Sequence, residues 1–146
     1  MPLREATIDD IPALHNIRMA VRENVLHSPG LATTDDYARY LTTDGKGWLF
    51  EERGEIKGFA IVNTRAHEVW AMFVHPDAEG RGIGAKLHDA LLEWYFEYFE
   101  DTLRLGTMPG TRAEQFYLRK GWKKQGGIRM NGEIRFTMSV TDYEKM

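Results

Sequence analysis

Apolar and polar positions follow two different periods at the centre of the chain. Val69–Val74 is an unbroken apolar run, too short for a helix and rich in strand formers, so it predicts a strand buried on both faces. Pro76 and Asp77 end this strand, because proline cannot donate to a ladder and aspartate favours turns. Helical spacing then predicts a helix that ends near Phe99. Its apolar positions are Ile83, Leu87, Leu91, Trp94 and Tyr98.

Similar patterns predict further elements on both sides of this centre. Thr111 followed by Glu114 is a capping-box arrangement. Turn residues at Arg53–Gly54 and Asn131–Gly132 predict two hairpins, the second with a two-residue turn. The expected segments are a strand at Leu3–Ile8; a helix capped by Asp9 or Asp10 with Ile11, Leu14, Val21 and Val25 on one face; a loop at His27–Thr34; a helix capped by Thr34 and ending at Leu41; strands at Trp48–Glu52 and Ile56–Asn63; the central strand and helix; a strand at Leu103–Thr107; a helix from Thr111 to Gly121; and a hairpin that starts at Trp122 and includes a strand from Ile134 to Val140.

Three glycines, Gly80, Gly82 and Gly84, join the central strand to the helix. Their spacing lets the backbone bend sharply and expose its amides. Because the first amides of a helix have no internal partner and the dipole is positive there, this turn predicts a phosphate site. The alternative is a tight connection whose glycines only satisfy backbone geometry. Two known phosphate patterns fit poorly: no Lys-Ser or Lys-Thr pair follows Gly84, and the third glycine comes one residue too early for a dinucleotide site.

Composition narrows the class of protein. With 146 residues, of which 42% are hydrophobic, the chain can build one domain with an ordinary core. A net charge of −3 without a long basic block makes nucleic acid and anionic membranes poor partners. The absence of cysteine excludes disulfides, thiolate metal sites and a cysteine nucleophile, and we expect no metal site. The N-terminus has no apolar signal core, so a cytoplasmic protein is expected.

The stretch from His67 to Leu92 resembles the acyl-CoA loop of the GNAT N-acetyltransferases. In that family Arg or Gln is followed by two residues, Gly, one residue, and Gly or Ala, after a strand that ends in a Val-x-Pro-like turn. The matching residues are Val74, Pro76, Gly82, Ile83 and Gly84, while Glu79 stands where the family has Arg or Gln. The resemblance implies that Glu79 points to solvent and that Arg81 compensates its charge. It also implies that main-chain amides bind the coenzyme A diphosphate, namely those of Gly80, Arg81, Gly82, Ile83, Gly84 and Ala85.

A second stretch, Thr111–Trp122, is similar to a helix of the same family. The family often has an asparagine at the position of Gly110, where its amide touches the pantetheine arm, so the backbone of Gly110 or the side chain of Thr111 is expected to substitute. The two motifs stand in the family's order and separation. The resemblance therefore implies one GNAT domain over residues 1–146, with an α+β (α/β-like) fold whose mixed central sheet of about six or seven strands has helices on both faces.

The resemblance also assigns roles in acetyl transfer. The backbone amide of Met72 stabilises the developing oxyanion, and the amides of Phe73 and Val74 pair with the pantetheine arm. Tyr117 matches the family's acid, which protonates the leaving thiolate; the alternative is that Tyr117 only packs beside Phe116. Without a cysteine, direct attack of the amine in a ternary complex is expected rather than an acyl-enzyme.

Glu68 is the candidate base that deprotonates the amine. It lies four residues before Met72, so period-two alternation predicts that both side chains face the same side of the strand. Some histone-modifying relatives carry their base at the matching position. The alternatives are a solvated charge at a strand end, His67 or His75, or a chain of water molecules.

The implied function is transfer of an acetyl group from acetyl-CoA to a primary amine of a small molecule or a protein. A non-catalytic acyl-CoA sensor with the same fold is the alternative. A third hypothesis, a donor such as succinyl-CoA, would need a cation near the acyl group, for which Arg22 and Arg65 are candidates. In the family the two N-terminal helices, the His27–Thr34 loop and the C-terminal hairpin line the acceptor groove, and homodimers are frequent.

Overall fold

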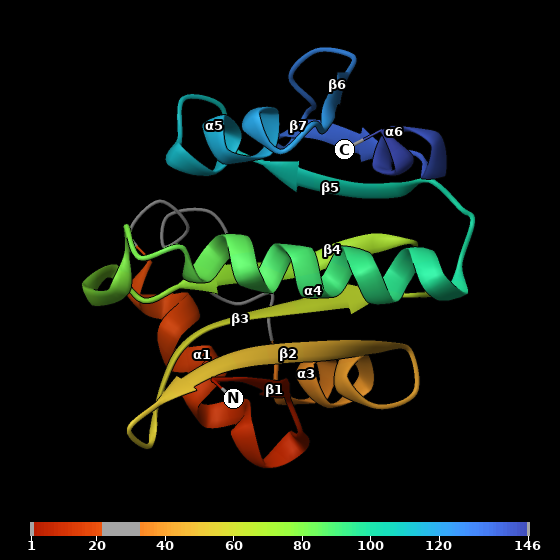
Figure 1. The fold of residues 1–146 in the computed structure, drawn as a ribbon. Coiled ribbons are helices and arrows are strands. Elements are labelled where there is room, and N and C mark those ends of the chain that lie inside the picture. Colours follow the sequence, from red (N-terminus) through yellow and green to blue (C-terminus); the bar gives the residue numbers. More distant parts are fainter. Residues whose placement is uncertain (1, 22–32, 146) are drawn as a thin grey trace. The chain divides into compact units, whose positions relative to one another are not determined.

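The computed structural model describes residues 2–21 and 33–145. The chain divides into two compact units, Met1–Trp94 and Tyr95–Met146 (Figure 1). Of the predicted loop at His27–Thr34, only Thr33 and Thr34 are described. Val25 and Arg22 also lie outside the described residues.

The first unit is built on an antiparallel sheet in the order β1-β2-β3-β4. The strands are β1 (Leu3–Glu5), β2 (Gly45–Glu52), β3 (Glu55–Asn63) and β4 (Glu68–Val74). Arg53 and Gly54 join β2 to β3 with φ of 55° and 78°. A two-residue hairpin turn with positive φ at both positions matches the twist of the strands, which confirms the predicted hairpin.

Helices cover both faces of this sheet. α1 (Ile11–Ala20) and α3 (Thr34–Leu41) lie on one face, where their apolar residues form a core with the inner sides of the strands. That core contains Ala6, Ile11, Leu14, Ile17, Tyr37, Leu41, Leu49, Phe59, Ile61 and Ala71. On the other face, a side chain at Gly58 would meet Ile83 and Leu87 of α4 (Ile83–Tyr98) at 3.2 and 3.1 Å. Figure 1 shows α4 in front of β3 and β4.

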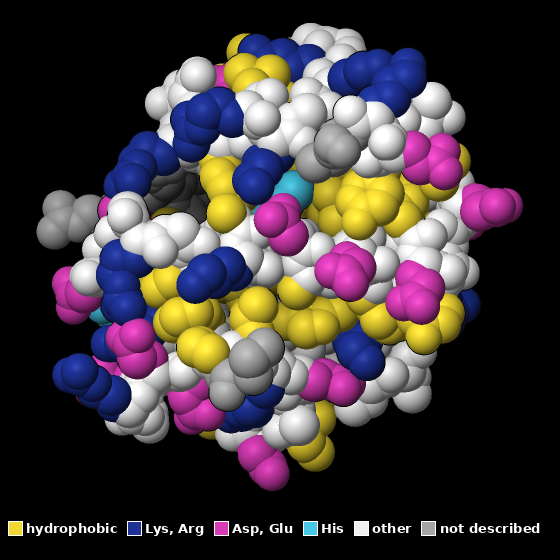
Figure 2. All heavy atoms as spheres, in the orientation of Figure 1, with side chains coloured by type: hydrophobic (Ala, Val, Ile, Leu, Met, Phe, Trp, Pro, Cys, Tyr) yellow, Lys and Arg dark blue, Asp and Glu magenta, His cyan; other side chains and the backbone are white. Residues whose placement is uncertain are grey.

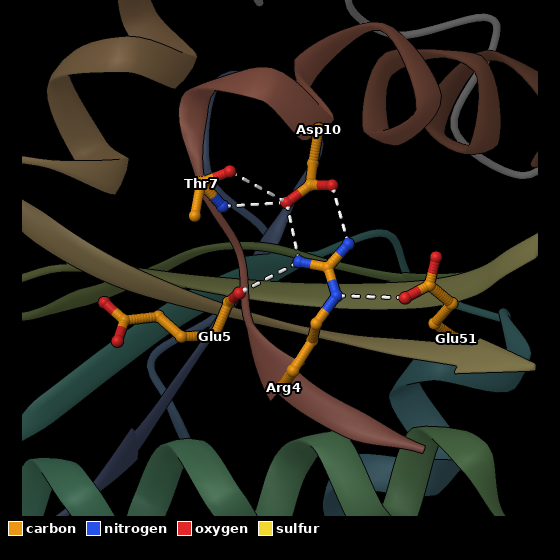
Figure 3. A network of polar contacts seen from close by, with 5 residues as sticks. All are labelled: Arg4, Glu5, Thr7, Asp10 and Glu51. Atoms are coloured by element: carbon orange, nitrogen blue, oxygen red, sulfur yellow. Dashed lines mark hydrogen bonds and ion pairs between the residues drawn. The ribbon is translucent and has the colours of Figure 1, made fainter. Parts of the chain in front are cut away.

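A polar network anchors β1 to the short 3-10 helix η1 (Ile8–Asp10) that leads into α1 (Figure 3). The Arg4 guanidinium donates to both Asp10 carboxylate oxygens, Oδ2 at 3.0 Å and Oδ1 at 2.9 Å, and to Oε1 of Glu51 at 3.0 Å. The backbone N–H of Thr7 donates to Asp10 Oδ2 at 2.8 Å. Hydrogen bonding to Arg4 is the main reason why the pKa of Asp10 lies below its usual value.

Two predicted helix boundaries move in the structure. α1 ends at Ala20, because Val21 is extended with φ −79° and ψ 109°. The cap of α3 is Thr33 rather than Thr34: the Thr33 side chain accepts from the N–H of Asp36, and the Asp36 carboxylate accepts from the Thr33 N–H. This reciprocal pair is a complete capping box.

The second unit contains a three-stranded antiparallel sheet, which follows the end of α4. Its order is β5 (Leu103–Thr107), β7 (Ile134–Met138) and β6 (Lys123–Gln125). α5 (Arg112–Arg119) lies between β5 and β6 in the chain and is followed by Gly121, whose φ is 93°. Positive φ at this position is the usual end of a helix.

The C-terminal hairpin differs from its prediction in two ways. Residues 126–133 connect β6 to β7, so Asn131–Gly132 is not a two-residue turn between strands. Instead, Asn131 Oδ1 accepts from the N–H of Glu133 inside this longer connection. The last strand ends at Met138, because Ser139 caps a short helix α6 (Val140–Glu144) by accepting from the N–H of Asp142.

The predicted order of strands and helices is otherwise confirmed, with seven strands in the two units together. Among the described residues, no helix has the length and apolar composition that a membrane crossing requires.

Candidate functional site

β4 carries an extra residue near its middle. Its pairing with β3 is regular from Gly58 opposite Val74 to Ile61 opposite Ala71, and it resumes with Val62 opposite Val69. Trp70 therefore has no partner of its own on β3, which is the arrangement of a β-bulge. A bulge bends the strand and interrupts the ladder at that point.

The apolar strand β4 is only half-buried, although its sequence predicted burial on both faces. Within β4 only Ala71 is buried, and the other six residues are partly exposed. By contrast, β3 has six consecutive buried residues, from Gly58 to Asn63. An apolar surface left partly uncovered in this way is typical of a binding site.

The backbone groups of β4 alternate between its two edges. His75 donates its N–H to the Lys57 carbonyl at 2.8 Å, so these residues form a hydrogen-bonded pair between β3 and the end of β4. In an antiparallel ladder such pairs alternate with pairs whose backbone groups point away. The N–H groups of Val74 and Met72 therefore point to the edge of β4 opposite β3, whereas the Phe73 N–H points to β3. This direction supports the sequence-predicted donors Met72 and Val74 and removes the Phe73 amide from that set.

The prediction that Glu68 and Met72 face the same side of β4 is wrong. Glu68 lies opposite Asn63, whereas Met72 lies opposite Ala60, and Asn63 and Ala60 point to opposite faces of β3. The extra residue at Trp70 shifts the alternation by one and causes this difference. The register places Glu68 on the face that α1 and α3 cover, and Met72 on the face that α4 covers.

The two histidines that flank β4 have local roles. His67 lies in the turn before β4 with a positive φ of 55°. His75 Nδ1 accepts from the N–H of Asp77 at 3.0 Å, which caps the 3-10 helix η2 (Pro76–Ala78). Because its ring nitrogen is used in the turn, His75 is the weaker of the candidate bases.

The glycine turn has a backbone shape that favours glycine at two positions. Gly80 and Gly82 have φ of 79° and 80°, and a Cβ atom on either would have no neighbour within 4 Å. The requirement for glycine there is therefore conformational and not steric. Gly84 differs, since it lies inside α4, and its Cβ would meet Val74 at 3.6 Å, an ordinary contact.

α4 begins directly after Gly82, with the Lys86 N–H donating to the Gly82 carbonyl at 3.1 Å. In a helix that starts at this bond, the amides of Ile83, Gly84 and Ala85 have no acceptor within the helix, and the dipole is positive there. Exposed Lys86 adds a cation in the first turn, with its Nζ 5.6 Å from the centre of the Phe50 ring. Figure 2 shows Lys or Arg side chains over the start of α4, on the left of the view. These features together are those of a helix start suited to an anion.

The charges of the turn are arranged partly as predicted. Glu79 is exposed, in agreement with its expected direction toward solvent. Arg81 Nη2 donates to both carboxylate oxygens of Glu52 on β2, at 3.0 and 2.8 Å. The hydrogen bonds between them raise the pKa of Arg81 and lower that of Glu52. Arg81 therefore pairs with Glu52, and the compensation of Glu79 by Arg81 stays a prediction.

In the second unit, Tyr117 is buried on α5 and only 6% exposed. Its ring contacts those of Phe116, Trp122 and Phe136, with centroid distances of 5.4, 5.7 and 6.1 Å. Burial raises the pKa of Tyr117, so its hydroxyl is protonated near neutrality and can donate. Both predicted roles, acid and core residue, require this protonated form, and the acid role stays a prediction.

Gly110 and Thr111 are engaged in the cap of α5. The Gly110 N–H donates to Glu114 Oε1 at 2.8 Å, and Thr111 Oγ1 accepts from the Glu114 N–H at 3.2 Å. Lys124 holds the second Glu114 oxygen, Oε2, at 2.9 Å, and hydrogen bonding to Lys124 is the main reason why the pKa of Glu114 is lowered. The predicted contacts of Gly110 and Thr111 with pantetheine stay untested, and both groups have local partners.

One residue that lies beside β4 was not identified from the sequence. Arg18 on α1 lies over the rings of Trp70 and Phe73, at 5.2 and 5.1 Å from their centroids. It is half-buried, and its Nη1 atom is buried without a hydrogen-bond partner among the residues described. The sequence does contain an indication of this position: Arg18 stands four residues after Leu14, so a charged residue occupies the apolar stripe of the helix.

The chain is similar to known acetyltransferases in sequence and fold. The model of the Acetyltransferase (GNAT) family matches residues 11–122. A ribosomal-protein-alanine N-acetyltransferase from Brucella melitensis has 23% identity and a TM-score of 0.75, covering 95% of this chain and 99% of its own. The ribosomal-protein-S18-alanine N-acetyltransferase from Escherichia coli has 17% identity and a TM-score of 0.75, with 94% and 92% covered. YncA, a putative acetyltransferase from Salmonella typhimurium solved with acetyl-CoA, has 16% identity and a TM-score of 0.73, with 94% and 92% covered. A comparison with curated proteins finds no match.

The family match covers most of the chain and includes both β4 and the glycine turn before α4. The solved structures share the fold over nearly their whole length, which agrees with the predicted fold class. The chain belongs to the acetyltransferase (GNAT) family.

Proposed function

We propose that this protein is an N-acetyltransferase that transfers the acetyl group of acetyl-CoA to a primary amine by direct attack in a ternary complex. The observation that carries the proposal is a set of main-chain donors in the first unit. It consists of the outward N–H groups of Met72 and Val74 on half-buried β4 and the amides at the start of α4. One solved relative was crystallised with acetyl-CoA and another with coenzyme A, which supports the same ligand here.

The residues at the helix start fit the diphosphate of coenzyme A. Positive φ at Gly80 and Gly82 bends the chain without side chains over the amides that follow. Ile83, Gly84 and Ala85 supply donors, and the helix dipole favours a doubly charged anion. Lys86 contributes a cation that the exposed Glu79 only partly offsets.

The donors on β4 suit an acyl chain that lies along the strand. The Val74 N–H is placed to bind a polar group of the pantetheine arm. The Met72 N–H, two residues away on the same edge, is placed to stabilise the negative charge that develops on the thioester oxygen. Neither donor is a side chain, so the apolar composition of Val69–Val74 is compatible with both roles.

Acetyl-CoA supplies the acetyl group as an activated thioester, and the protein must supply proton transfers and orientation. Glu68 is the proposed base because its face is that of α1 and α3, the family's acceptor side. Tyr117 is the proposed acid for the leaving thiolate, and its raised pKa keeps the proton on the hydroxyl. An acyl-enzyme on sulfur is excluded, because the chain has no cysteine.

Thiol release from acetyl-CoA tests this function directly. The purified protein is incubated with acetyl-CoA and a panel of amines that includes free amino acids, polyamines and peptides with alanine at the N-terminus. Peptides belong in the panel because two relatives are named for ribosomal-protein alanine. The proposal predicts thiol release that depends on an amine. Tight coenzyme A binding without release with any amine would instead support the acyl-CoA sensor.

A further inference from the structure

Arg18 carries a buried nitrogen, Nη1, that has no hydrogen-bond partner among the described residues, and it lies on the α1 and α3 face of β4. Its guanidinium lies 5.1 Å from the centre of the Phe73 ring, and Phe73 directly follows Met72, the proposed donor to the thioester oxygen. Arg18 also lies over Trp70, which is the bulge residue. It is close enough to Tyr37 that its charge and a side-chain hydrogen bond oppose the rise in the pKa of Tyr37 that burial causes. The cation therefore lies beside the segment of β4 where acetyl transfer is proposed to occur.

Among the described residues, Arg18 is surrounded by aromatic rings, and no carboxylate pairs with it. Tyr37 and Tyr40 each contact the Trp70 ring with centroid distances of 5.0 Å, so the cation borders a wall of aromatic rings. Such rings attract a cation but provide no carboxylate oxygen for its N–H groups. Among residues 2–21 and 33–145, Arg18 forms no ion pair, whereas Arg4, Arg39 and Arg81 each have a carboxylate partner.

An unpaired buried N–H is unfavourable, and it becomes favourable when a ligand supplies the acceptor. Guanidinium groups are the side chains best suited to a carboxylate, because their planar N–H groups match its two oxygens. The aromatic wall keeps water away and strengthens such a pair. Glu68 shares this face of β4 by register and is the proposed base for the amine of the same ligand.

We propose that Arg18 binds a carboxylate of the acceptor, so that the preferred amines are amino acids or other amines that carry a carboxylate. This inference rests on the proposed function for the identity of the reaction, but the carboxylate site itself can be tested without turnover. A carboxylate on the acyl group of the donor, as in succinyl-CoA, would bind to Arg18 in the same way. Kinetics with succinyl-CoA distinguish the two sources of the carboxylate. The acceptor is favoured because Arg18 lies on the α1 and α3 face, while the donors for the thioester lie on the strand edge.

The test compares matched amines that differ only in the carboxylate. kcat/KM is measured with acetyl-CoA for amino acids, their carboxamides and the corresponding decarboxylated amines, using the wild type, Arg18→Met and Arg18→Lys. The wild type is expected to prefer the acid about 10- to 100-fold, the range for a charge-assisted hydrogen bond. Arg18→Met should reduce this preference to about one, mainly through KM, while the value for the carboxamide changes little. Arg18→Lys should keep part of the preference, since it retains charge without the planar fork.

Arg39→Met is the matched control, because Arg39 also lies over an aromatic ring, Tyr40, but is exposed and paired with Asp44. It should leave the preference unchanged. The inference is overturned if the wild type treats acid and carboxamide alike, or if Arg18→Met lowers both by the same factor. The inference is also overturned if Arg18→Met lowers kcat/KM only when succinyl-CoA is the donor and the amine has no carboxylate. Arg18 would then bind the carboxylate of the donor and not that of the acceptor.

Calorimetry separates this inference from the proposed function. If no amine is acetylated, the proposed function fails, and binding of an amino acid and its carboxamide is measured in the presence of coenzyme A. Preferential binding of the acid by the wild type but not by Arg18→Met supports the carboxylate site, and equal binding overturns it. Thermal unfolding of each variant checks that the methionine side chain preserves the packing of α1.

Discussion

Two charged residues, Asp10 and Arg18, differ in how fully the protein itself supplies their hydrogen-bond partners. Asp10 is satisfied from within, with two hydrogen bonds from Arg4 and one from the backbone of Thr7 (Figure 3). Arg18 has aromatic neighbours, and its buried Nη1 has no partner within the described part of the chain. The first arrangement stabilises the fold, whereas the second is the basis of the proposed carboxylate site.

Asp10→Asn is expected to destabilise the protein by about 1–2 kcal/mol at pH 7, because a charge-assisted pair is lost and the arginine is partly exposed to water. The pKa of Asp10 is lowered in the folded state, so its stabilisation is present above the unfolded pKa of about 3.9 and lost as the pH falls through the folded value. Urea unfolding of both proteins as a function of pH measures this. The difference in the free energy of unfolding between the wild type and the variant should disappear at low pH. A difference that does not depend on pH would contradict the role of the charge.

Tyr117→Phe should lower kcat by about 10²-fold if the hydroxyl protonates the leaving thiolate. The ring contacts with Phe116, Trp122 and Phe136 are kept, so the melting temperature should change little. Steady-state kinetics and coenzyme A calorimetry on the same preparation check both points. An unchanged kcat would leave Tyr117 as a core residue only.

Glu68→Gln should reduce turnover near neutrality and move the rise of the rate with pH towards the pKa of the free amine, about 10.4 for a lysine-type acceptor. Affinity for acetyl-CoA should be nearly unchanged, because no predicted ligand contact involves this side chain. The pH profile of kcat/KM is the readout. Identical profiles for the variant and the wild type would exclude Glu68 as the base.

At the scale of elements, backbone shape separates the glycines of the turn. Gly82 needs its φ of 80°, while Gly84 is helical and has room for a methyl group. Backbone conformation therefore requires glycine at position 82 but not at position 84, although both glycines match the family pattern.

Gly82→Ala is expected to cost about 1 kcal/mol or more of stability, because an L-residue is strained at positive φ, and to weaken binding of coenzyme A. Gly84→Ala should be neutral or stabilising by roughly 0.5–1 kcal/mol, since alanine favours helix. Urea unfolding and calorimetry on the pair give both quantities. Equal effects of the two substitutions would contradict the distinction.

Local signals predicted most elements but not the register of β4. Leu103–Thr107, the Arg53–Gly54 turn and the start of α4 depend on neighbouring residues, and the structure confirms each. The bulge at Trp70 depends on how β4 pairs with β3, which no window of the sequence shows. For this reason the relation between Glu68 and Met72 was predicted incorrectly. The eight residues between β6 and β7 show the same limit, because a favourable turn pair does not fix strand length.

At the scale of the whole molecule, the chain matches the GNAT family model and has the same fold as acetyltransferases with which it shares little sequence identity. In this chain a half-buried strand leads through a glycine turn into a long helix. Most of its proposed ligand contacts are main-chain amides. Under the proposals made here, main-chain amides bind the donor and the side chain of Arg18 selects the acceptor.

The central claim is that coenzyme A is bound by backbone N–H groups at the start of α4 and by those of β4 that point away from β3. Amide ¹H–¹⁵N spectra recorded during a titration with coenzyme A test it most directly. The account predicts saturable shifts concentrated at residues 80–86 and at Met72 and Val74, with a smaller change at Phe73, whose N–H points to β3. No shifts at millimolar coenzyme A, or saturable shifts confined to other residues, would contradict it.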